Sequence, residues 1–402
     1  MSHFHLRFLS FSDLKEIRTF SKKYIHPSDY GAGYMADKAS RFQIYAENLR
    51  DPAVQILKET VLSCGGEMVT NRDVLIRKCG TSAVVMMLTK HQVETILPRL
   101  KMQQFGLPQL AEELEELFAQ TCPRGERVMT YPGGELVFGK KTLVMGILNC
   151  TPDSFSDGGL WYDTDRAVEH ALQMEEDGAD IIDIGGESTR SGSDVVTAEE
   201  EQRRVLPVIE RLKGKLHVPI SIDSYKAETA KAALDAGADI INDVWGFQYD
   251  QGEMAKVAAE AGCPVILMHN KTDAVYENFM SEMMAFLRRS IEIAVEAGCD
   301  RNKIIVDPGF GFGFGKDMEH NLQLTAKLKE MTSLGCPVLM AASHKKTVGL
   351  VLDAPADQRM MGDAAVTAIS IANGADMIRV HDVKEMTQVA KMADAIVRGG
   401  GY

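Results

Sequence analysis

The sequence predicts an α/β protein with a (β/α)8 TIM barrel over residues 141–402, preceded by a smaller α/β domain over residues 1–125. Three observations predict this architecture. After residue 141, eight short apolar runs alternate with segments of helical period. Several of those helical segments close with a glycine directly ahead of the next run, as a C-cap would. Eight βα units in about 260 residues also have the count and size of such a barrel. A doubly wound open sheet is the competing fold, but no GxGxxG motif follows the first strand.

The first domain has a different pattern and offers no catalytic constellation. We predict strands near residues 4–8, 41–46 and 83–88, and helices near residues 52–64, 90–104 and 108–120. Gly65-Gly66 would end the first of these helices as a C-cap pair. The histidines are dispersed and no P-loop is present. The role of this domain is therefore unknown, and a structural or oligomerising role is the default expectation. Residues 126–140 contain Tyr131-Pro132-Gly133-Gly134, a Pro-Gly sequence that is typical of the turn in a linker or a hairpin.

The barrel strands are expected where the apolar runs lie, and each run ends in polar or small residues. They cover residues 143–148, 181–186, 219–223, 240–242, 265–269, 304–307, 338–343 and 377–381. Helices are expected between them, for example over residues 166–178, 198–212, 227–237 and 279–298. The segments at residues 151–160 and 188–196 are long for βα loops and could close over the mouth of the barrel. Because the carboxyl ends of the strands form the catalytic face of such barrels, the polar strand ends should meet there.

The polar residues at the strand ends divide into two chemical kinds, of which the first suits a ring. An aspartate at a strand end is often only a helix cap, but eight polar ends in register are more than capping requires. Asp223, Asn242 and Asp307 offer donors and acceptors that suit the edge of a planar, nitrogen-rich heterocycle. Met268 would supply an apolar surface against the face of that ring.

The second kind is cationic and suits an anion. Lys345, Arg379 and His381 bring positive charge, and Asn149 and Thr189 add neutral polar groups. This set suits a phosphate or pyrophosphate, and a magnesium ion there would stabilise pyrophosphate as a leaving group. The residues by themselves therefore predict transfer of a group away from a pyrophosphate, on a substrate that carries a heterocycle.

Composition restricts the partners and the compartment. With 45% hydrophobic and 25% charged residues, the chain has an ordinary globular composition, and no apolar run is long enough to span a membrane. The net charge of −13 argues against nucleic acid as a partner, although a few local cations could still hold a small anion. The seven cysteines are scattered without a CxxC pair, and the start of the chain lacks a secretory signal. We therefore expect free thiols and a cytoplasmic protein.

Six motifs resemble those of one enzyme family, in that family's order, across residues 142–398. They are MGILNCTPDSFSDGG, DIGGESTR, SIDS, INDV, DPGFGF and IRVHDV, and they are similar to the motifs of the dihydropteroate synthases. The resemblance implies a TIM barrel that joins 6-hydroxymethyl-7,8-dihydropterin pyrophosphate to 4-aminobenzoate, giving dihydropteroate and pyrophosphate in folate biosynthesis. It further implies that pyrophosphate departs to leave a pterin-stabilised cation, which the aromatic amine attacks. Members of this family are commonly homodimers through barrel helices far from the mouth.

The resemblance also assigns roles to individual residues. Pterin contacts are implied for Asp223, Asn242, Asp307 and Lys345, and pyrophosphate contacts for Arg379 and His381. The candidate catalytic residues are therefore Asp223, Asp307, Lys345, Arg379 and His381. The candidate substrate contacts are these five with Thr189, Arg190, Asn242, Met268, Phe310 and Phe312. The candidate cofactor is Mg²⁺, with Asn149 as the residue linked to it.

Three places depart from the family's pattern. Ser191 stands where proline is common, and His344 and Lys346 flank Lys345 where arginine and serine are common. Lys346 could still pair with the carboxylate of 4-aminobenzoate. The segment DPGFGFGFGK has one Phe-Gly unit more than usual, as sulfonamide-insensitive relatives do. The extra Phe312 or Phe314 is expected to narrow the aminobenzoate pocket against bulkier sulfonamides, and a neutral change of loop length is the alternative.

Two other functions remain open at this point. A pterin-binding methyltransferase shares the barrel and some pterin contacts, but it would not need Arg379-Val380-His381 or the SFSDGG loop. The second alternative is a barrel that has lost catalysis and serves as a binding partner. In that case the N-terminal domain would carry the function. Release of pyrophosphate that depends on 4-aminobenzoate would separate the synthase from both.

Overall fold

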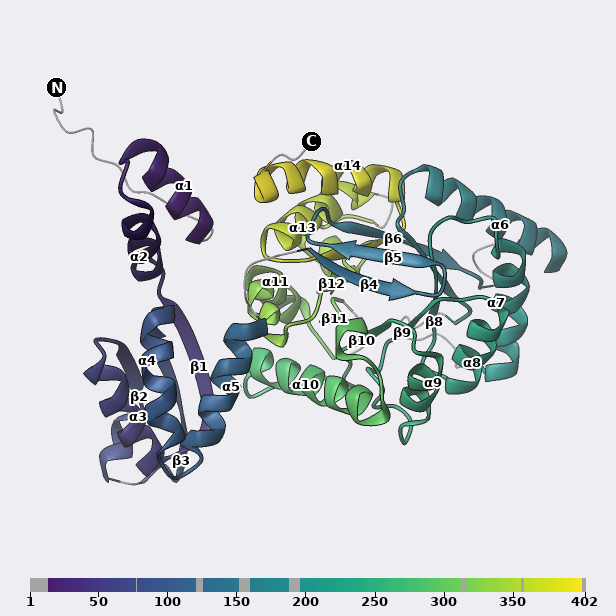
Figure 1. Cartoon of the computed structure of the whole chain (residues 1–402). Helices are drawn as coiled ribbons and strands as arrows, with labels where there is room; N and C mark the ends of the chain where they lie inside the picture. The colour runs from purple at the N-terminus through teal and green to yellow at the C-terminus, as the bar shows by residue number, and fades with distance from the viewer. Residues whose placement is uncertain are drawn as a thin grey trace. The chain divides into compact units, whose positions relative to one another are not determined.

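The computed structural model describes residues 14–76, 78–120, 126–151, 160–187, 196–311, 315–355 and 358–399. The chain divides into two compact units, Met1–Pro123 and Arg124–Tyr402 (Figure 1). Each unit has its own cluster of buried apolar residues. In the described residues, no helix is both long enough and apolar enough to cross a membrane.

The N-terminal unit is an α+β arrangement around an antiparallel sheet. Its strands are β1 (Phe42–Arg50), β2 (Glu67–Thr70) and β3 (Thr81–Leu88), in the order β1-β3-β2. Its helices are α1 (Leu14–Tyr24), α2 (Asp29–Ala39), α3 (Asp51–Ser63), α4 (Lys90–Lys101) and α5 (Leu107–Gln120), with a short 3-10 turn, η1 (Arg72–Ile76). Val54, Leu57 and Val61 recur at helical spacing on α3 and are buried in the cluster that includes β1 and β3 residues.

Most predicted elements of this unit are present, and three further ones were missed. The helices α3, α4 and α5 and the strands β1 and β3 overlap the predicted ranges. The helices α1 and α2 and the strand β2 were not predicted. Gly31 and Gly33 lower the helix propensity of α2, which instead begins at a cap in which Ser28 accepts a hydrogen bond from the N–H of Gly31. The strand predicted near residues 4–8 lies outside the described residues.

A hairpin closes one end of the barrel. Strands β4 (Arg127–Tyr131) and β5 (Gly134–Phe138) pair antiparallel around the turn at Pro132-Gly133. Met129, Leu136 and Phe138 of the hairpin are buried against residues near the amino ends of the barrel strands, including Ile181 and Ile266. The hairpin therefore covers the barrel at the end opposite the carboxyl ends of its strands.

The predicted (β/α)8 barrel is confirmed. Its strands are β6 (Leu143–Asn149), β7 (Ile181–Gly185), β8 (Ile220–Asp223), β9 (Ile240–Asp243), β10 (Val265–Met268), β11 (Ile304–Asp307), β12 (Leu339–Met340) and β13 (Met377–Val380). They are parallel, in the order β11-β10-β9-β8-β7-β6-β13-β12, and a bridge between Val306 and Val338 joins β11 to β12. The strand β12 is much shorter than the predicted run at 338–343, because Ala341 and Ser343 leave the ladder to take part in the site described below.

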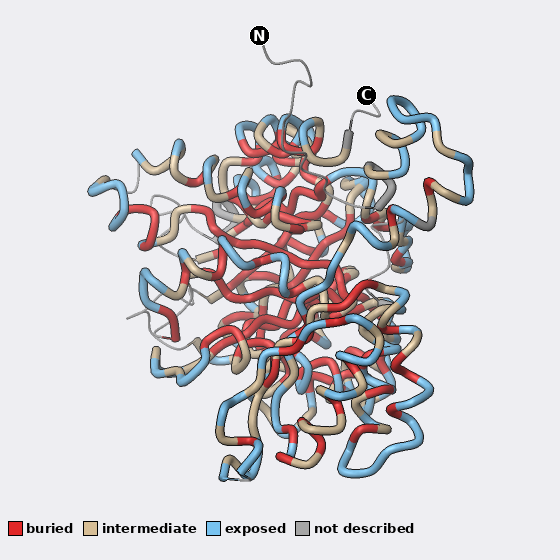
Figure 2. Tube along the Cα trace, turned by 90° about the vertical axis from the view of Figure 1, so that its left-hand side faces the viewer, coloured by how far each residue is buried: buried red, intermediate tan, exposed pale blue. Residues whose placement is uncertain are grey.

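Helices surround the strands, as the alternating pattern requires. They are α6 (Leu160–Glu176), α7 (Ala198–Leu212), α8 (Ala227–Ala236), α9 (Glu253–Ala261), α10 (Phe279–Ala297), α11 (Met318–Lys327), α12 (Lys346–Leu352), α13 (Met360–Ala372) and α14 (Val383–Asp394), with the short turns η3 (Arg301–Lys303), η4 (Leu328–Leu334) and η6 (Ala395–Gly399). Gly237 and Gly298, with φ of 128° and 107°, end α8 and α10 just before a strand or its lead-in turn, as predicted. Figure 2 shows that the buried residues lie mainly along the barrel strands.

Candidate active site

The side chains inside the barrel form layers that follow the two-residue period of the strands. A lower apolar layer contains Met145, Ile181, Ile240, Ile266, Ile305, Leu339 and Met377. Two positions further along the same strands stand Ile147, Asp183, Asn242, Met268, Asp307, Ala341 and Arg379. Because alternate residues of a strand share a face, this second set lies directly above the apolar layer, toward the carboxyl ends of the strands.

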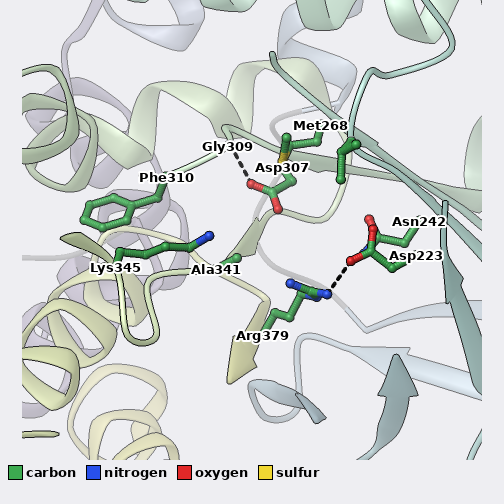
Figure 3. A pocket seen from close by; sticks show the side chains of 10 residues that line it. Asp223, Asn242, Met268, Asp307, Gly309, Phe310, Ala341, Lys345 and Arg379 are labelled. Carbon is green, nitrogen blue, oxygen red and sulfur yellow. Dashed lines mark hydrogen bonds and ion pairs between the residues drawn. The ribbon is translucent and has the colours of Figure 1, made fainter. Parts of the chain in front are cut away.

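A pocket opens at this upper layer (Figure 3). It is lined by Asp223, Asn242, Val244, Met268, Asp307, Gly309, Phe310, Ala341, Lys345 and Arg379. Seven of the twelve candidate site residues are therefore brought together, although up to 156 positions separate them along the chain. His381 and Asn149 are not among the lining residues, and Thr189, Arg190 and Phe312 lie outside the described residues.

Arg379 is held by two carboxylates on one side of the pocket. Its Nε donates to Oδ2 of Asp183 at 2.6 Å, and its Nη2 donates to Oδ2 of Asp223 at 2.5 Å. The Nδ2 of Asn242 donates to the same Asp183 oxygen at 3.1 Å. Asp183 is completely buried. The sequence places it at one of the polar strand ends, but no role in the site was assigned to it from the sequence. Its position two residues after Ile181, on the inward-facing side of the strand, is the signal that could have indicated its role.

Burial and charge together set the ionisation of this group. Burial raises the pKa of Asp223, the Arg379 guanidinium opposes that rise, and the charges of Asp183 and Glu201 add to it. Burial alone would lower the pKa of Arg379, but Asp183 and Asp223 outweigh it, so that its pKa is raised. Arg379 is therefore a permanent cation between two desolvated acidic groups.

Asp307 presents a second buried carboxylate to the pocket. Its Oδ1 accepts a hydrogen bond of 2.6 Å from the N–H of Gly309, two residues beyond the end of β11. Gly309 has φ of +70°, and a Cβ there would lie 2.3 Å from the carbonyl oxygen of His269, so only glycine fits. Burial raises the pKa of Asp307, while the Gly309 N–H and the charges of Lys345, Arg379 and Lys316 lower it. Figure 3 shows the Asp307, Lys345 and Arg379 side chains converging on one space.

His381 lies beside this space, in a cluster at the rim. Its backbone N–H donates to Oγ of Ser343 at 3.2 Å, and its Nδ1 lies 3.1 Å from the same oxygen. The ring of His344 stacks on that of His381 with centroids 4.6 Å apart, and its Nε2 is 2.7 Å from Oδ2 of Asp382. The histidine that departs from the expected motif thus holds the end of β13 in place. Lys345 follows as the cap residue of α12.

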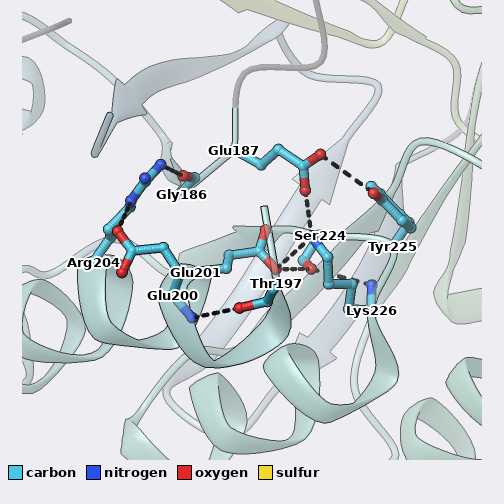
Figure 4. A network of polar contacts seen from close by, with 9 residues as sticks. All are labelled: Gly186, Glu187, Thr197, Glu200, Glu201, Arg204, Ser224, Tyr225 and Lys226. Atoms are coloured by element: carbon cyan, nitrogen blue, oxygen red, sulfur yellow. Dashed lines mark hydrogen bonds and ion pairs between the residues drawn. The ribbon is translucent and has the colours of Figure 1, made fainter. Parts of the chain in front are cut away.

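A second polar network holds the chain just before residues 188–195 (Figure 4). Lys226 pairs with Glu187 and, at 3.2 Å, with the buried Glu201, which also accepts a hydrogen bond of 3.0 Å from Ser224. Tyr225 donates to Glu187 at 3.3 Å. The network fixes Glu187 against the residues that follow Asp223, and Glu201 brings its negative charge to that carboxyl. The sequence pattern gave no sign of this pairing.

The donor set near Asn149 can be compared with what magnesium requires. Asn149 ends β6, where it pairs with Gly185 of β7 and is partly exposed. In the described residues, no group of three or more His, Cys, Asp or Glu side chains could hold a metal ion by itself. Magnesium is commonly held by one or two protein oxygens together with substrate phosphates. The residues therefore fit an ion that arrives with a phosphorylated ligand, to which Asn149 would contribute one amide oxygen.

Comparisons with known proteins define the class of this barrel and its pocket. The family model described as pterin binding enzyme matches residues 145–381. The chain therefore belongs to the pterin-binding enzyme family. The match does not extend to the N-terminal unit.

The chain is similar to several dihydropteroate synthases. The chain is 51% identical over 281 residues to the dihydropteroate synthase of Bacillus subtilis, covering 70% of this chain and 97% of that one. A crystal structure of the dihydropteroate synthase from Clostridium difficile in the presence of pteroic acid is 46% identical, with a TM-score of 0.63 over 65% of this chain and 98% of that one. The Xanthomonas albilineans dihydropteroate synthase with 4-aminobenzoic acid is 40% identical, with a TM-score of 0.64 over 68% and 98%.

Proposed function

We propose that this chain is a dihydropteroate synthase, a transferase that joins 6-hydroxymethyl-7,8-dihydropterin pyrophosphate to 4-aminobenzoate. The observation that carries the proposal is the composition of one pocket. Buried acceptors and donors, Asp307 and Asn242, stand in it together with the cations Lys345 and Arg379. The relatives at 40% to 51% identity support the same reaction.

The base of the pocket suits the pterin ring. Asp307 and Asp223 are acceptors for the amino and ring N–H groups of the pterin edge, and Asn242 adds an amide that can donate as well as accept. Met268 and Phe310 supply apolar walls, and both are buried. Because the carboxylates are desolvated, their hydrogen bonds to the ring are stronger than they would be in water.

The cations suit the diphosphate and its departure. The contacts within the described residues engage Nε and Nη2 of Arg379, so its Nη1 is the nitrogen that can meet a phosphate oxygen. Lys345 and His381 add charge and a donor at the rim. The bond between the methylene carbon and the diphosphate oxygen breaks with its electron pair on oxygen. The aromatic amine then forms a C–N bond to that carbon and loses a proton. Thr189 and Arg190 are proposed to lie beside the substrates. The protein contributes positioning and electrostatic stabilisation.

Magnesium completes the proposal as a companion of the diphosphate. Bound to the phosphate oxygens and to Asn149, it would supply charge neutralisation for the leaving group. Omitting the ion or replacing Asn149 by alanine should then weaken diphosphate binding while leaving binding of the bare pterin unchanged.

The test of the function is release of pyrophosphate from the pterin pyrophosphate. Release that requires 4-aminobenzoate and yields dihydropteroate supports the synthase. Transfer of a methyl group from a methyl-tetrahydropterin would identify the methyltransferase alternative, and pterin binding without turnover would identify a binding partner. Either result would overturn the proposal.

The additional Phe-Gly unit leads to a prediction about sulfonamides. We expect deletion of Phe312-Gly313 to lower the sulfonamide inhibition constant by about tenfold, because removing one aromatic obstruction from a pocket changes discrimination by that order. The Michaelis constant for 4-aminobenzoate, measured in the same assay, should change less. Equal inhibition of the deletion variant and the wild type would leave the insertion as a neutral change of loop length.

We further propose that the enzyme is a homodimer that associates through α11, α12 and α13. Leu322, Leu350, Val351, Met361 and Ile369 are large apolar residues that remain exposed on these three neighbouring helices. Exposed apolar residues that gather on adjacent helices are typical of an interface. We expect Leu350→Glu combined with Ile369→Glu to halve the mass measured by light scattering, while Val295→Glu on α10 leaves it at twice the chain mass. A wild type with the mass of one chain would contradict the dimer.

A cytoplasmic location is the last part of the proposal. The cysteines in the described part of the chain, Cys64, Cys79, Cys150, Cys263, Cys299 and Cys336, are all free thiols, as is usual in a reducing compartment.

A further inference from the structure

A buried lysine lies behind the pocket and has no part in the function described above. Lys316 stands just before α11 and is only 7% exposed. Its Nζ is 2.8 Å from Nδ1 of His269 and 3.5 Å from the carbonyl oxygen of His269. The same nitrogen is 3.3 Å from the point where a Cβ on Gly309 would be. Lys316 thus touches the back of the residue whose N–H holds Asp307.

The partner of this lysine is a neutral histidine. Burial, followed by the charges of Lys316 and Lys271, lowers the pKa of His269 to about 2. Its Nδ1 is therefore an unprotonated acceptor for the Lys316 ammonium, and its Nε2 carries the ring hydrogen. His269 orients the ammonium but supplies no negative charge to balance it. Within the described part of the chain, no ion pair joins Lys316 to a carboxylate. A buried cation without such a contact is costly and is typical of functional sites.

The negative charge that balances Lys316 comes from Asp307. Burial lowers the pKa of Lys316 to about 7, Asp307 opposes that change, and Lys345 adds to it. Conversely, Lys316 is one of the three cations that lower the pKa of Asp307, with Lys345 and Arg379. Among the described residues, Lys271 and Tyr276 also lie near His269, and they contact each other at 4.3 Å between Nζ and ring centroid. Neither carries a negative charge at neutral pH, and Asp307 is the acidic group whose charge raises the pKa of Lys316.

We propose that Lys316 is a positioning residue for pterin recognition, whose ammonium, held by His269 behind Gly309, keeps Asp307 ionised so that its carboxylate accepts hydrogen bonds from the ring edge. The inference rests on the proposed function. A protonated Asp307 would present a hydroxyl donor to the donors of the pterin, and that mismatch would weaken binding.

The direction of the pH effect follows from the two groups. Asp307 has a raised pKa, so its carboxylate is lost as the pH falls. Lys316 gains its proton as the pH falls through about 7, so its charge is present where Asp307 would otherwise take up a proton. Without that charge the pKa of Asp307 rises further, and loss of pterin binding begins at a higher pH.

The experiment is the pH dependence of the dissociation constant for 6-hydroxymethyl-7,8-dihydropterin, measured by calorimetry between pH 6 and 9. In Lys316→Met, the acid limb of binding should move up by about one pH unit, which is about tenfold weaker binding on the acid side and little change at pH 9. Lys316→Arg, which keeps the charge, should move back toward the wild-type profile. Lys271→Met is the matched control, because Lys271 also lies beside His269 but is partly exposed, and it should follow the wild type.

A Lys316→Met profile parallel to the wild type would overturn the inference, since a merely structural lysine lowers affinity equally at every pH. If Lys316→Met does not fold, as judged by circular dichroism, Lys316→Gln gives the same readout with the same two outcomes. A wild type that binds no pterin at any pH would overturn the proposed function itself, and this inference with it.

Discussion

Replacing Arg379 with methionine is expected to reduce turnover severely and to destabilise the barrel at the same time. Arg379 is the cation for Asp183, which is completely buried, and for Asp223. Removing one partner of a buried ionic cluster typically costs about 3–5 kcal/mol, because the remaining charges are left without compensation. Loss of a cation aimed at the leaving group should also lower kcat/KM by roughly a thousandfold. Urea unfolding and pyrophosphate release measure the two effects.

The stability loss in Arg379→Met should depend on pH in a defined direction. Without the guanidinium, the pKa of Asp223, already raised by burial, rises further in the folded state. The folded protein then holds a proton that the unfolded chain releases, so stability falls as the pH rises from the unfolded value toward the folded one. The deficit relative to wild type should be larger at pH 8 than at pH 5. Arg379→Lys is the control: a point charge should recover part of the stability without the two-pronged contact. Equal stability of Arg379→Met and wild type at pH 8 would contradict this account.

Asp307→Asn is expected to separate binding from folding. The substitution keeps the shape and the acceptor for the Gly309 N–H, but it places an amide donor or a neutral oxygen where the ring donors need a carboxylate. A buried polar mismatch of this kind costs about 2–4 kcal/mol, so the pterin dissociation constant should rise by about a hundredfold. The melting temperature should stay the same or rise, because the raised pKa of Asp307 means that burying its charged form costs stability, a cost that a neutral asparagine avoids.

The matched control for this substitution is Asp317→Asn. Asp317 is exposed, lies ten positions further along the chain, and caps α11 by accepting a hydrogen bond from the N–H of His320 at 2.9 Å. Asparagine is an equally good cap, so neither the pterin affinity nor the melting temperature should change. Pterin binding by Asp307→Asn that matched the wild type would remove Asp307 from the recognition site.

The strands, and the residues that line the pocket, could be predicted because both follow from the pattern of apolar and polar residues along the sequence. Buried parallel strands are short continuous apolar runs, and their carboxyl ends must meet on one face. That reasoning brings Asp223, Asp307 and Arg379 into one place without any knowledge of their contacts. It overestimated β12, since Ala341, directly after Met340, lines the pocket instead of pairing in the ladder.

The pairings inside the site could not be predicted in the same way. Asp183 and Arg379 are 196 positions apart, and their contact depends on how the strands close around the barrel. Lys316 follows the segment with the added Phe-Gly unit, where spacing no longer indicates which face a side chain takes. Glu187 and Lys226 lie beyond their strands, in turns whose direction is fixed by tertiary contacts. In each case the missing information was three-dimensional distance between charges.

The hairpin at the foot of the barrel has a consequence for the chemistry at the opposite end. Met129, Leu136 and Phe138 pack against the apolar layer at the amino ends of the barrel strands and exclude water from that end of the barrel. This water-free apolar layer lowers the local dielectric constant beneath Asp183 and Asp307. The electrostatic interactions of the charged groups in the pocket are stronger as a result. A smaller side chain in place of Phe138 would admit water at this end of the barrel. It would therefore weaken substrate binding, although the hairpin makes no contact with the substrate.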